Sequence, residues 1–289
     1  MKLPALICAV ILCLGLASCS DNPAAPTTVP TTTVTTVPTT APSDPGMKTI
    51  YVHTSITSSS DTMDATTEYV YDDNGYLTEV IQYSGTTQTQ RYTVVCDENG
   101  NFTQWNTTVG SLILSIHYAY DEEGNKLGSA QYHNGELMTQ TVYTIENGLR
   151  TEIITIMPAQ NQETRTRYTY NSQGVRVRED YLVNNVLQRY GVYTTDSQGR
   201  VAFVNFYLAD GTLHSTVAYT YDGATETQTL QDPAGNILQK DVITRDENGN
   251  IHTTHRYNGE GVLTATKTET WQALTIPVDC PRKTDSALA

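Results

Sequence analysis

Along most of the chain, apolar and polar residues alternate in short runs that end in acidic, glycine-containing turns. The stretch 118–127, Tyr-Ala-Tyr-Asp-Glu-Glu-Gly-Asn-Lys-Leu, is the clearest example. In a strand, Tyr118 and Tyr120 point to one face because successive side chains alternate. Asp121 can hydrogen-bond its own backbone, and Gly124 supplies the positive φ that a hairpin turn needs. The stretch therefore predicts a strand, a tight turn and the start of the next strand.

The same unit recurs at an even spacing from residue 69 to residue 251. Its turn glycines are separated by 25, 24, 24, 26, 25, 24 and 26 residues. They are Gly75, Gly100, Gly124, Gly148, Gly174, Gly199, Gly223 and Gly249. A second turn falls about midway in each period, as in residues 132–135, Tyr-His-Asn-Gly. Each period thus holds two strands of roughly eight residues, and eight periods predict about sixteen strands.

We therefore predict an all-β fold, an elongated antiparallel sheet of tandem β-hairpin repeats of about 25 residues each. Open, twisted sheets with this many strands coil or split, which favours a sheet curled into a partial shell. The alternative is a β-propeller, in which pairs of hairpins form blades of about 50 residues.

The repeats resemble the RHS/YD repeat family, whose units run Tyr-x-Tyr-Asp-x-x-Gly-Arg-Leu. The resemblance covers residues 69 to about 265. Its best matches are Tyr69–Leu77, Tyr118–Leu127, Tyr168–Val177 and Tyr193–Val201. Only Gly199-Arg200-Val201 keeps the arginine after the glycine. Family members that wrap a toxin in a closed shell have far more repeats and a toxic domain after them, whereas a short tail follows Trp271 here. The resemblance implies the hairpin repeat and leaves the function open.

Residues 1–19 have the pattern of a lipoprotein signal peptide. The largely apolar run from Leu3 to Ala17 is shorter than the roughly 20 residues of a membrane-spanning helix. The run ends in Leu-Ala-Ser-Cys at residues 16–19, which resembles the lipobox of bacterial lipoproteins. By that resemblance Cys19 is the diacylated N-terminal residue that carries acyl chains such as palmitate, and more than one chain gives stable anchoring. The alternative is an ordinary secretory signal in which Cys19 is incidental.

The rest of the chain divides by composition. Residues 20–46 form a Thr/Pro-rich linker without Lys or Arg, which stays extended. Residues 47–272 form the YD-like β-hairpin repeat domain, which holds all 19 tyrosines, and residues 273–289 form a C-terminal tail. We expect a protein held by its lipid on the extracytoplasmic face of a bacterial cell membrane, with the linker as a spacer.

The net charge of the chain limits the classes of partner that it is expected to bind. The formal net charge is -14 and the pI is about 4.7, which argues against nucleic acid and against anionic lipid headgroups. Cys96 and Cys280 remain after removal of the signal peptide and use of Cys19. They can form one disulfide in an oxidising compartment. Alternatively, Cys96 fills the place of a repeat tyrosine as a small apolar residue.

The residues that suggest chemistry are also explained by the repeat. The turns at Asp97–Asn101 and Asp246–Asn250 offer oxygen ligands, but their glycine is fourth where a calcium-binding EF-hand needs it sixth. His252 and His255 are three residues apart and point to opposite faces of a strand. No Gly-x-Ser-x-Gly elbow or phosphate-binding loop appears, and no carboxylate pair stands out as a glycosidase dyad. We predict no catalytic site, no cofactor and no metal.

The tyrosines that precede the second turns are the best candidates for ligand binding. They are Tyr83, Tyr132, Tyr181, Tyr207 and Tyr257. Stacked hairpins could align these rings into a ladder, and ring faces suit sugars and extended peptides. The alternative is that the rings pair across strands and fill the core of the sheet. The resulting prediction is a non-catalytic surface module that binds glycan, wall polymer or protein. The alternatives are a structural scaffold without a small ligand and a polysaccharide-acting enzyme.

Overall fold

The computed structural model describes residues 47–60, 63–73, 75–97 and 99–277. These residues form eighteen β-strands and one short 3₁₀-helix, and among them no helix is long and apolar enough to cross a bilayer. The elements are β1 (Met47–Ser60), β2 (Met63–Tyr71), β3 (Leu77–Ser84), β4 (Thr87–Cys96), β5 (Phe102–Val109), β6 (Leu112–Tyr120), β7 (Lys126–His133), β8 (Glu136–Glu146), β9 (Leu149–Met157), η1 (Pro158–Gln160), β10 (Gln162–Tyr170), β11 (Arg176–Val183), β12 (Val186–Thr195), β13 (Val201–Leu208), β14 (Leu213–Asp222), β15 (Thr225–Gln231), β16 (Ile237–Arg245), β17 (Ile251–Asn258) and β18 (Leu263–Pro277).

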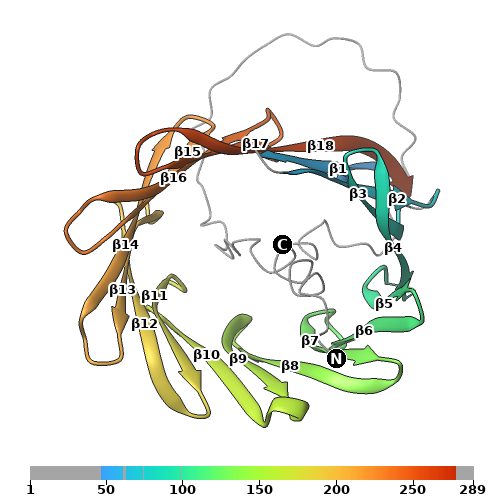
Figure 1. The fold of residues 1–289 in the computed structure, drawn as a ribbon, viewed down its shortest axis with the longest axis horizontal. Helices are drawn as coiled ribbons and strands as arrows, with labels where there is room; N and C mark the ends of the chain where they lie inside the picture. The colour runs from blue at the N-terminus through green and yellow to red at the C-terminus, as the bar shows by residue number, and fades with distance from the viewer. Residues whose placement is uncertain (1–46, 61–62, 74, 98, 278–289) are drawn as a thin grey trace.

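All eighteen strands belong to one sheet that closes on itself. Each strand pairs antiparallel with the next one along the chain, and β1 also pairs with β18. Figure 1 shows the resulting ring, with the last strand beside the first. The prediction of an all-β antiparallel repeat is confirmed. The predicted open sheet, curled only into a partial shell, is wrong because the ring is a closed barrel. The propeller alternative is also wrong, since the strands form one sheet instead of separate blades.

The two strands that close the barrel lie outside the eight glycine periods. Strands β2–β17 supply the sixteen predicted from the repeats, and β1 and β18 add one at each end. These two are the longest strands, and thirteen residue pairs join them, from Met47↔Pro277 to Ser60↔Ala265. Pairing of β1 with β18 satisfies the backbone groups that an open sheet leaves unpaired at its two edges. β18 continues to Pro277, five residues past the end of the predicted repeat domain.

The turn chemistry of the repeat is confirmed. All eight period glycines have positive φ, between 58° and 84°. In the turn after β4, the Gly100 N–H donates to the Asp97 carbonyl over 3.0 Å. The Asp97 carboxylate accepts from the Asn99 and Asn101 backbone N–H groups, at 2.9 and 2.8 Å. The aspartate thus holds the turn through its own backbone, as the sequence predicted.

The paired tyrosines share one face of the sheet, here called the tyrosine face. The cross-strand pairs place Tyr69 opposite Val80 and Tyr118 opposite Ser129, and strand alternation carries Tyr71 and Tyr120 to the same side. The largest buried cluster lies on this face at β3–β5. It contains Leu77, Val80, Tyr92, Val94, Phe102 and Trp105. A smaller cluster, Ile50, Val52 and Ile276, joins β1 to β18.

Gly128 on β7 marks a close approach between neighbouring strands. A Cβ at this buried position would lie 2.3 Å from the Thr141 carbonyl oxygen on β8. That neighbour is backbone, so β7 and β8 would have to separate.

Gly128→Ala is therefore expected to lower the free energy of unfolding by about 1–3 kcal/mol. Urea denaturation followed by circular dichroism measures the loss. Ser129→Ala, on the other face of the same strand, is the control and should change stability little. Equal stability of Gly128→Ala and the wild-type chain would show that the strands accommodate the methyl group.

Candidate binding surface

The five predicted tyrosines do not form one ladder. Four of them, Tyr83, Tyr132, Tyr207 and Tyr257, lie on the face opposite the tyrosine face, whereas Tyr181 lies on the tyrosine face. They belong to β3, β7, β11, β13 and β17, so no two are on adjacent strands. The expected alignment of their rings is therefore wrong. Their role in ligand binding stays a prediction.

Each of these half-buried tyrosines contacts a side chain on a neighbouring strand. The Tyr83 hydroxyl donates to Glu68 Oε2 over 3.1 Å, and the Tyr132 ring lies 5.1 Å from the His117 ring. The other partners are Arg189, 5.1 Å from the Tyr181 ring, Lys240, 4.8 Å from the Tyr257 ring, and Tyr190 against Tyr207. Most of these rings are thus paired with a single cation, carboxylate or imidazole.

Tyr207 differs because its partner is a second tyrosine. The Tyr190 and Tyr207 rings stack with centroids 5.0 Å apart and an interplanar angle of 19°. The Arg178 guanidinium lies 4.1 Å from the Tyr190 centroid. Residues 178, 190 and 207 come from the adjacent strands β11, β12 and β13. Arg178 and the two rings therefore form one continuous aromatic and cationic patch, here called the Tyr190–Tyr207 platform.

The tyrosine face contains a set of cations that the sequence analysis missed. Lys126, Arg150 and Arg176 lie over the rings of Tyr118, Tyr143 and Tyr168, at 4.2, 4.5 and 4.2 Å from the centroids. Each of these cations is the second residue after a turn glycine, at Gly124, Gly148 and Gly174. This spacing of two residues is a signal in the sequence itself, and it differs from the family pattern, in which the arginine directly follows the glycine.

The tyrosine hydroxyls of this face take part in internal packing. The Tyr170 hydroxyl donates to the Arg150 carbonyl over 2.7 Å, and the Tyr221 hydroxyl donates to the Val201 carbonyl over 3.0 Å. Burial, the largest influence, raises the pKa of Tyr118 to about 12 and that of Tyr69 to about 12. These phenols therefore remain neutral hydrogen-bond donors at neutral pH.

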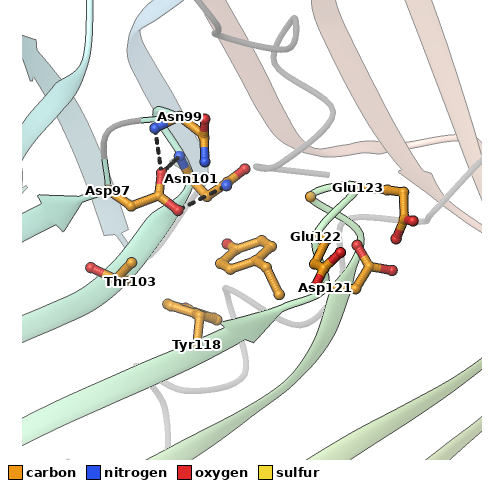
Figure 2. A pocket seen from close by; sticks show the side chains of 10 residues that line it. Asp97, Asn99, Asn101, Thr103, Tyr118, Asp121, Glu122 and Glu123 are labelled. Carbon is orange, nitrogen blue, oxygen red and sulfur yellow. Dashed lines mark hydrogen bonds between the residues drawn. The ribbon is translucent and has the colours of Figure 1, made fainter.

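Two consecutive acidic turns border a shallow cavity of about 370 Å³ (Figure 2). Asp97, Asn99 and Asn101 come from the turn after β4, and Asp121 belongs to the turn after β6. The Asp97 and Asp121 carboxylates are used by their own turns, since each accepts the backbone N–H and the side-chain amide of the asparagine four residues later. Among the described residues, no three His, Cys, Asp or Glu side chains gather as a metal site.

The cysteine predictions fall largely outside the described residues. Cys19, the predicted lipid site, lies in residues 1–46, and Cys280 lies in residues 278–289. Neither lipidation nor a disulfide with Cys280 is addressed by the structure. Cys96 is half-buried at the end of β4, with Sγ 3.6 Å from the Leu77 carbonyl oxygen.

Comparisons with known proteins return distant matches to solved structures. No protein-family model matches the chain, and no curated protein matches it either. Among solved structures, the TcdB2-TccC3-Cdc42 complex matches 69% of this chain and 13% of its own, with 17% identity and a TM-score of 0.39. A porin-like protein from Bacteroides uniformis matches 76% of this chain and 96% of its own, with 14% identity and a TM-score of 0.29. A porin-like protein from Bacteroides vulgatus matches 76% and 98%, with 12% identity and a TM-score of 0.33.

Proposed function

We propose that this chain is a membrane-anchored surface lipoprotein whose closed β-repeat barrel is a non-catalytic module that binds an extended glycan. The observation that carries the proposal is the Tyr190–Tyr207 platform, with two stacked rings and the adjacent Arg178 on one face of three neighbouring strands. Aromatic side chains offer apolar ring surface and a polar hydroxyl, which suits ligands that present both C–H and O–H groups. The anchor rests on the sequence of residues 1–19, and the linker of residues 20–46 would separate the barrel from the membrane.

The barrel gives this platform a rigid support. β12 pairs with β11 on one side and β13 on the other, so the backbone beneath the rings is hydrogen-bonded in both directions. Binding groups on rigid elements lose little conformational entropy when a ligand binds. The same closure weakens the scaffold alternative, because association through sheet edges needs an unpaired strand and each described strand has two neighbours.

A binding assay with ring-deleted variants tests the proposal. The purified full chain is screened against a glycan array and purified cell-wall polymers, and the affinity of any saturable ligand is measured by calorimetry. Tyr190→Ala and Tyr207→Ala are each expected to weaken binding about tenfold or more, because aromatic residues at the centre of a binding surface contribute a large share of the affinity.

Tyr51→Ala is the control for these variants. Tyr51 is an exposed tyrosine on β1, away from strands β11–β13. Its replacement should leave the affinity unchanged. Absence of any saturable ligand for the folded chain, or binding that neither platform variant weakens, would refute the proposed function.

A further inference from the structure

A row of charged side chains extends the Tyr190–Tyr207 platform in a straight line across the sheet. The cross-strand pairs are Glu152↔Arg167, Arg167↔Asp180, Asp180↔Tyr190 and Tyr190↔Tyr207. These five residues occupy the adjacent strands β9–β13, and each is directly opposite the next. Their side chains therefore share one face. At about 4.8 Å between strands, the row is about 19 Å long.

The charges beside the platform are paired and balanced. Arg167 Nε lies 2.8 Å from Glu152 Oε1, and Arg178 contacts Asp180 Oδ1 at 2.7 Å. Next to them, Arg165 Nε lies 2.6 Å from Glu163 Oε1. Three carboxylates and three guanidinium groups give this patch a local net charge of zero, although the whole chain carries -14.

The row combines exposed hydrogen-bond donors with partly buried acceptors, since the Glu152 and Asp180 side chains are 18% and 26% exposed. The side chains of Arg167 and Arg178 are 50% and 39% exposed. Among the described residues, the contacts of Glu152 and Asp180 involve Oε1 and Oδ1. Their second oxygens, Oε2 and Oδ2, therefore remain as acceptors. A hydroxyl group can donate to such an oxygen and accept from a neighbouring guanidinium.

From this row we infer that the ligand is a neutral, hydroxyl-rich linear polysaccharide that lies across strands β9–β13. The inference deepens the proposed function and rests on it. Sugar rings pack on Tyr190 and Tyr207, and hydroxyls of the following units bond to Asp180, Arg167 and Glu152. An anionic polymer would meet three carboxylates on a chain of negative net charge, and a polycation would meet three guanidinium groups. A neutral polymer meets no charge repulsion and uses both kinds of polar group.

The test compares neutral and anionic polymers on the full chain. Affinity electrophoresis uses a panel of soluble neutral glucans, mannans and galactans together with polygalacturonate, and calorimetry then uses oligosaccharides of increasing length from the polymer that binds. The neutral polymer is expected to be retained, with affinity that rises with chain length until the row is filled. Asp180→Asn and Arg167→Gln should each weaken its binding about tenfold, because each removes a charge-assisted hydrogen bond.

Arg91→Gln is the matched control. Arg91 forms a similar ion pair with Glu79, at 3.5 Å, on the same face but on β3 and β4. Its replacement should change the affinity less than about twofold. Circular dichroism establishes that each variant is folded.

The outcomes separate this inference from the proposed function. Retention of polygalacturonate in preference to every neutral polymer, with binding that still depends on Tyr190, would overturn the neutral-ligand inference and leave the binding module in place. Binding of a neutral polymer that is unaffected by Asp180→Asn and Arg167→Gln would overturn the extended row. Failure to bind any polymer would refute both.

Discussion

Replacing Glu269 with alanine is expected to lower the free energy of unfolding by about 1–3 kcal/mol, because it removes a buried carboxylate that two partners share at the closure of the barrel. The Glu269 side chain is 4% exposed, and its Oε2 lies 2.5 Å from His53 Nε2 on β1. Its Oε1 lies 2.7 Å from Lys267 Nζ. The His53 ring also stacks on Trp271, with centroids 3.6 Å apart. Loss of the carboxylate leaves His53 and Lys267 without this shared acceptor.

The same carboxylate predicts a pH dependence with a definite sign. Burial, the largest influence, acts to raise the pKa of Glu269, but hydrogen bonds and charges from His53 and Lys267 together hold that pKa below its ordinary value of 4.5. A depressed pKa in the folded state means that the carboxylate stabilises the fold fully above pH 4.5. That stabilisation is lost as the pH falls below this value.

Urea denaturation at several pH values measures both effects. The wild-type chain should lose stability on acidification below pH 4.5 more steeply than Glu269→Ala does. Glu260 is an exposed acidic residue in the turn after β17, and Glu260→Ala is the control. Its free energy of unfolding should stay within about 0.5 kcal/mol of that of the wild-type chain. Parallel acid dependence of the wild-type chain and Glu269→Ala would contradict this account of the closure.

The hairpins were predictable from sequence because their signals are local. Asp97 and Gly100 lie within one turn, and the spacing of Tyr118 and Tyr120 fixes their common face without any distant contact. The closure was not predictable in this way. His53 and Glu269 are 216 residues apart, and neither β1 nor β18 carries the tyrosine–aspartate–glycine unit. Whether a twisted sheet closes depends on how twist accumulates over all its strands, which no single repeat encodes.

Only part of the candidate site could be predicted from the sequence, for a related reason. Tyr207 was selected by its position before a second turn, whereas Tyr190 lies in the middle of β12 and has no turn beside it. The row Glu152–Arg167–Asp180–Tyr190–Tyr207 has sequence spacings of 15, 13, 10 and 17 residues. The spacings are unequal because a straight row across antiparallel strands lies at different distances from successive turns, and bulges such as those between Thr169 and Tyr170 and between Tyr181 and Leu182 shift the register by one residue more. The register between neighbouring strands brings these five residues together, and the sequence pattern did not specify that register.

Replacing Trp105 with alanine is expected to cost about 3–5 kcal/mol, the loss typical of a large aromatic side chain removed from a core. Trp105 is 6% exposed and lies 5.9 Å from Tyr92 and 6.3 Å from Phe102 between ring centroids. In a barrel made of one sheet, most side chains are only half-buried. Six of the twelve buried hydrophobic residues among those described belong to this one cluster at β3–β5. We therefore expect this cluster to contribute a large share of the stability of the barrel. The cavity that Trp105→Ala would leave has few buried neighbours that could fill it.

Trp105→Phe is the matched variant that separates packing from polarity. The buried Trp105 Nε1 has no hydrogen-bond partner among the described residues, and a buried donor without a partner costs about 1–3 kcal/mol. Phenylalanine removes that donor while it keeps an aromatic ring in the cluster.

We expect the free energy of unfolding of Trp105→Phe to stay within about 1 kcal/mol of that of the wild-type chain, because the lost volume and the removed donor act in opposite directions. Urea denaturation followed by circular dichroism compares the three chains. If Trp105→Phe is as unstable as Trp105→Ala, the indole ring itself is required and the cluster does not stabilise the barrel through apolar packing alone.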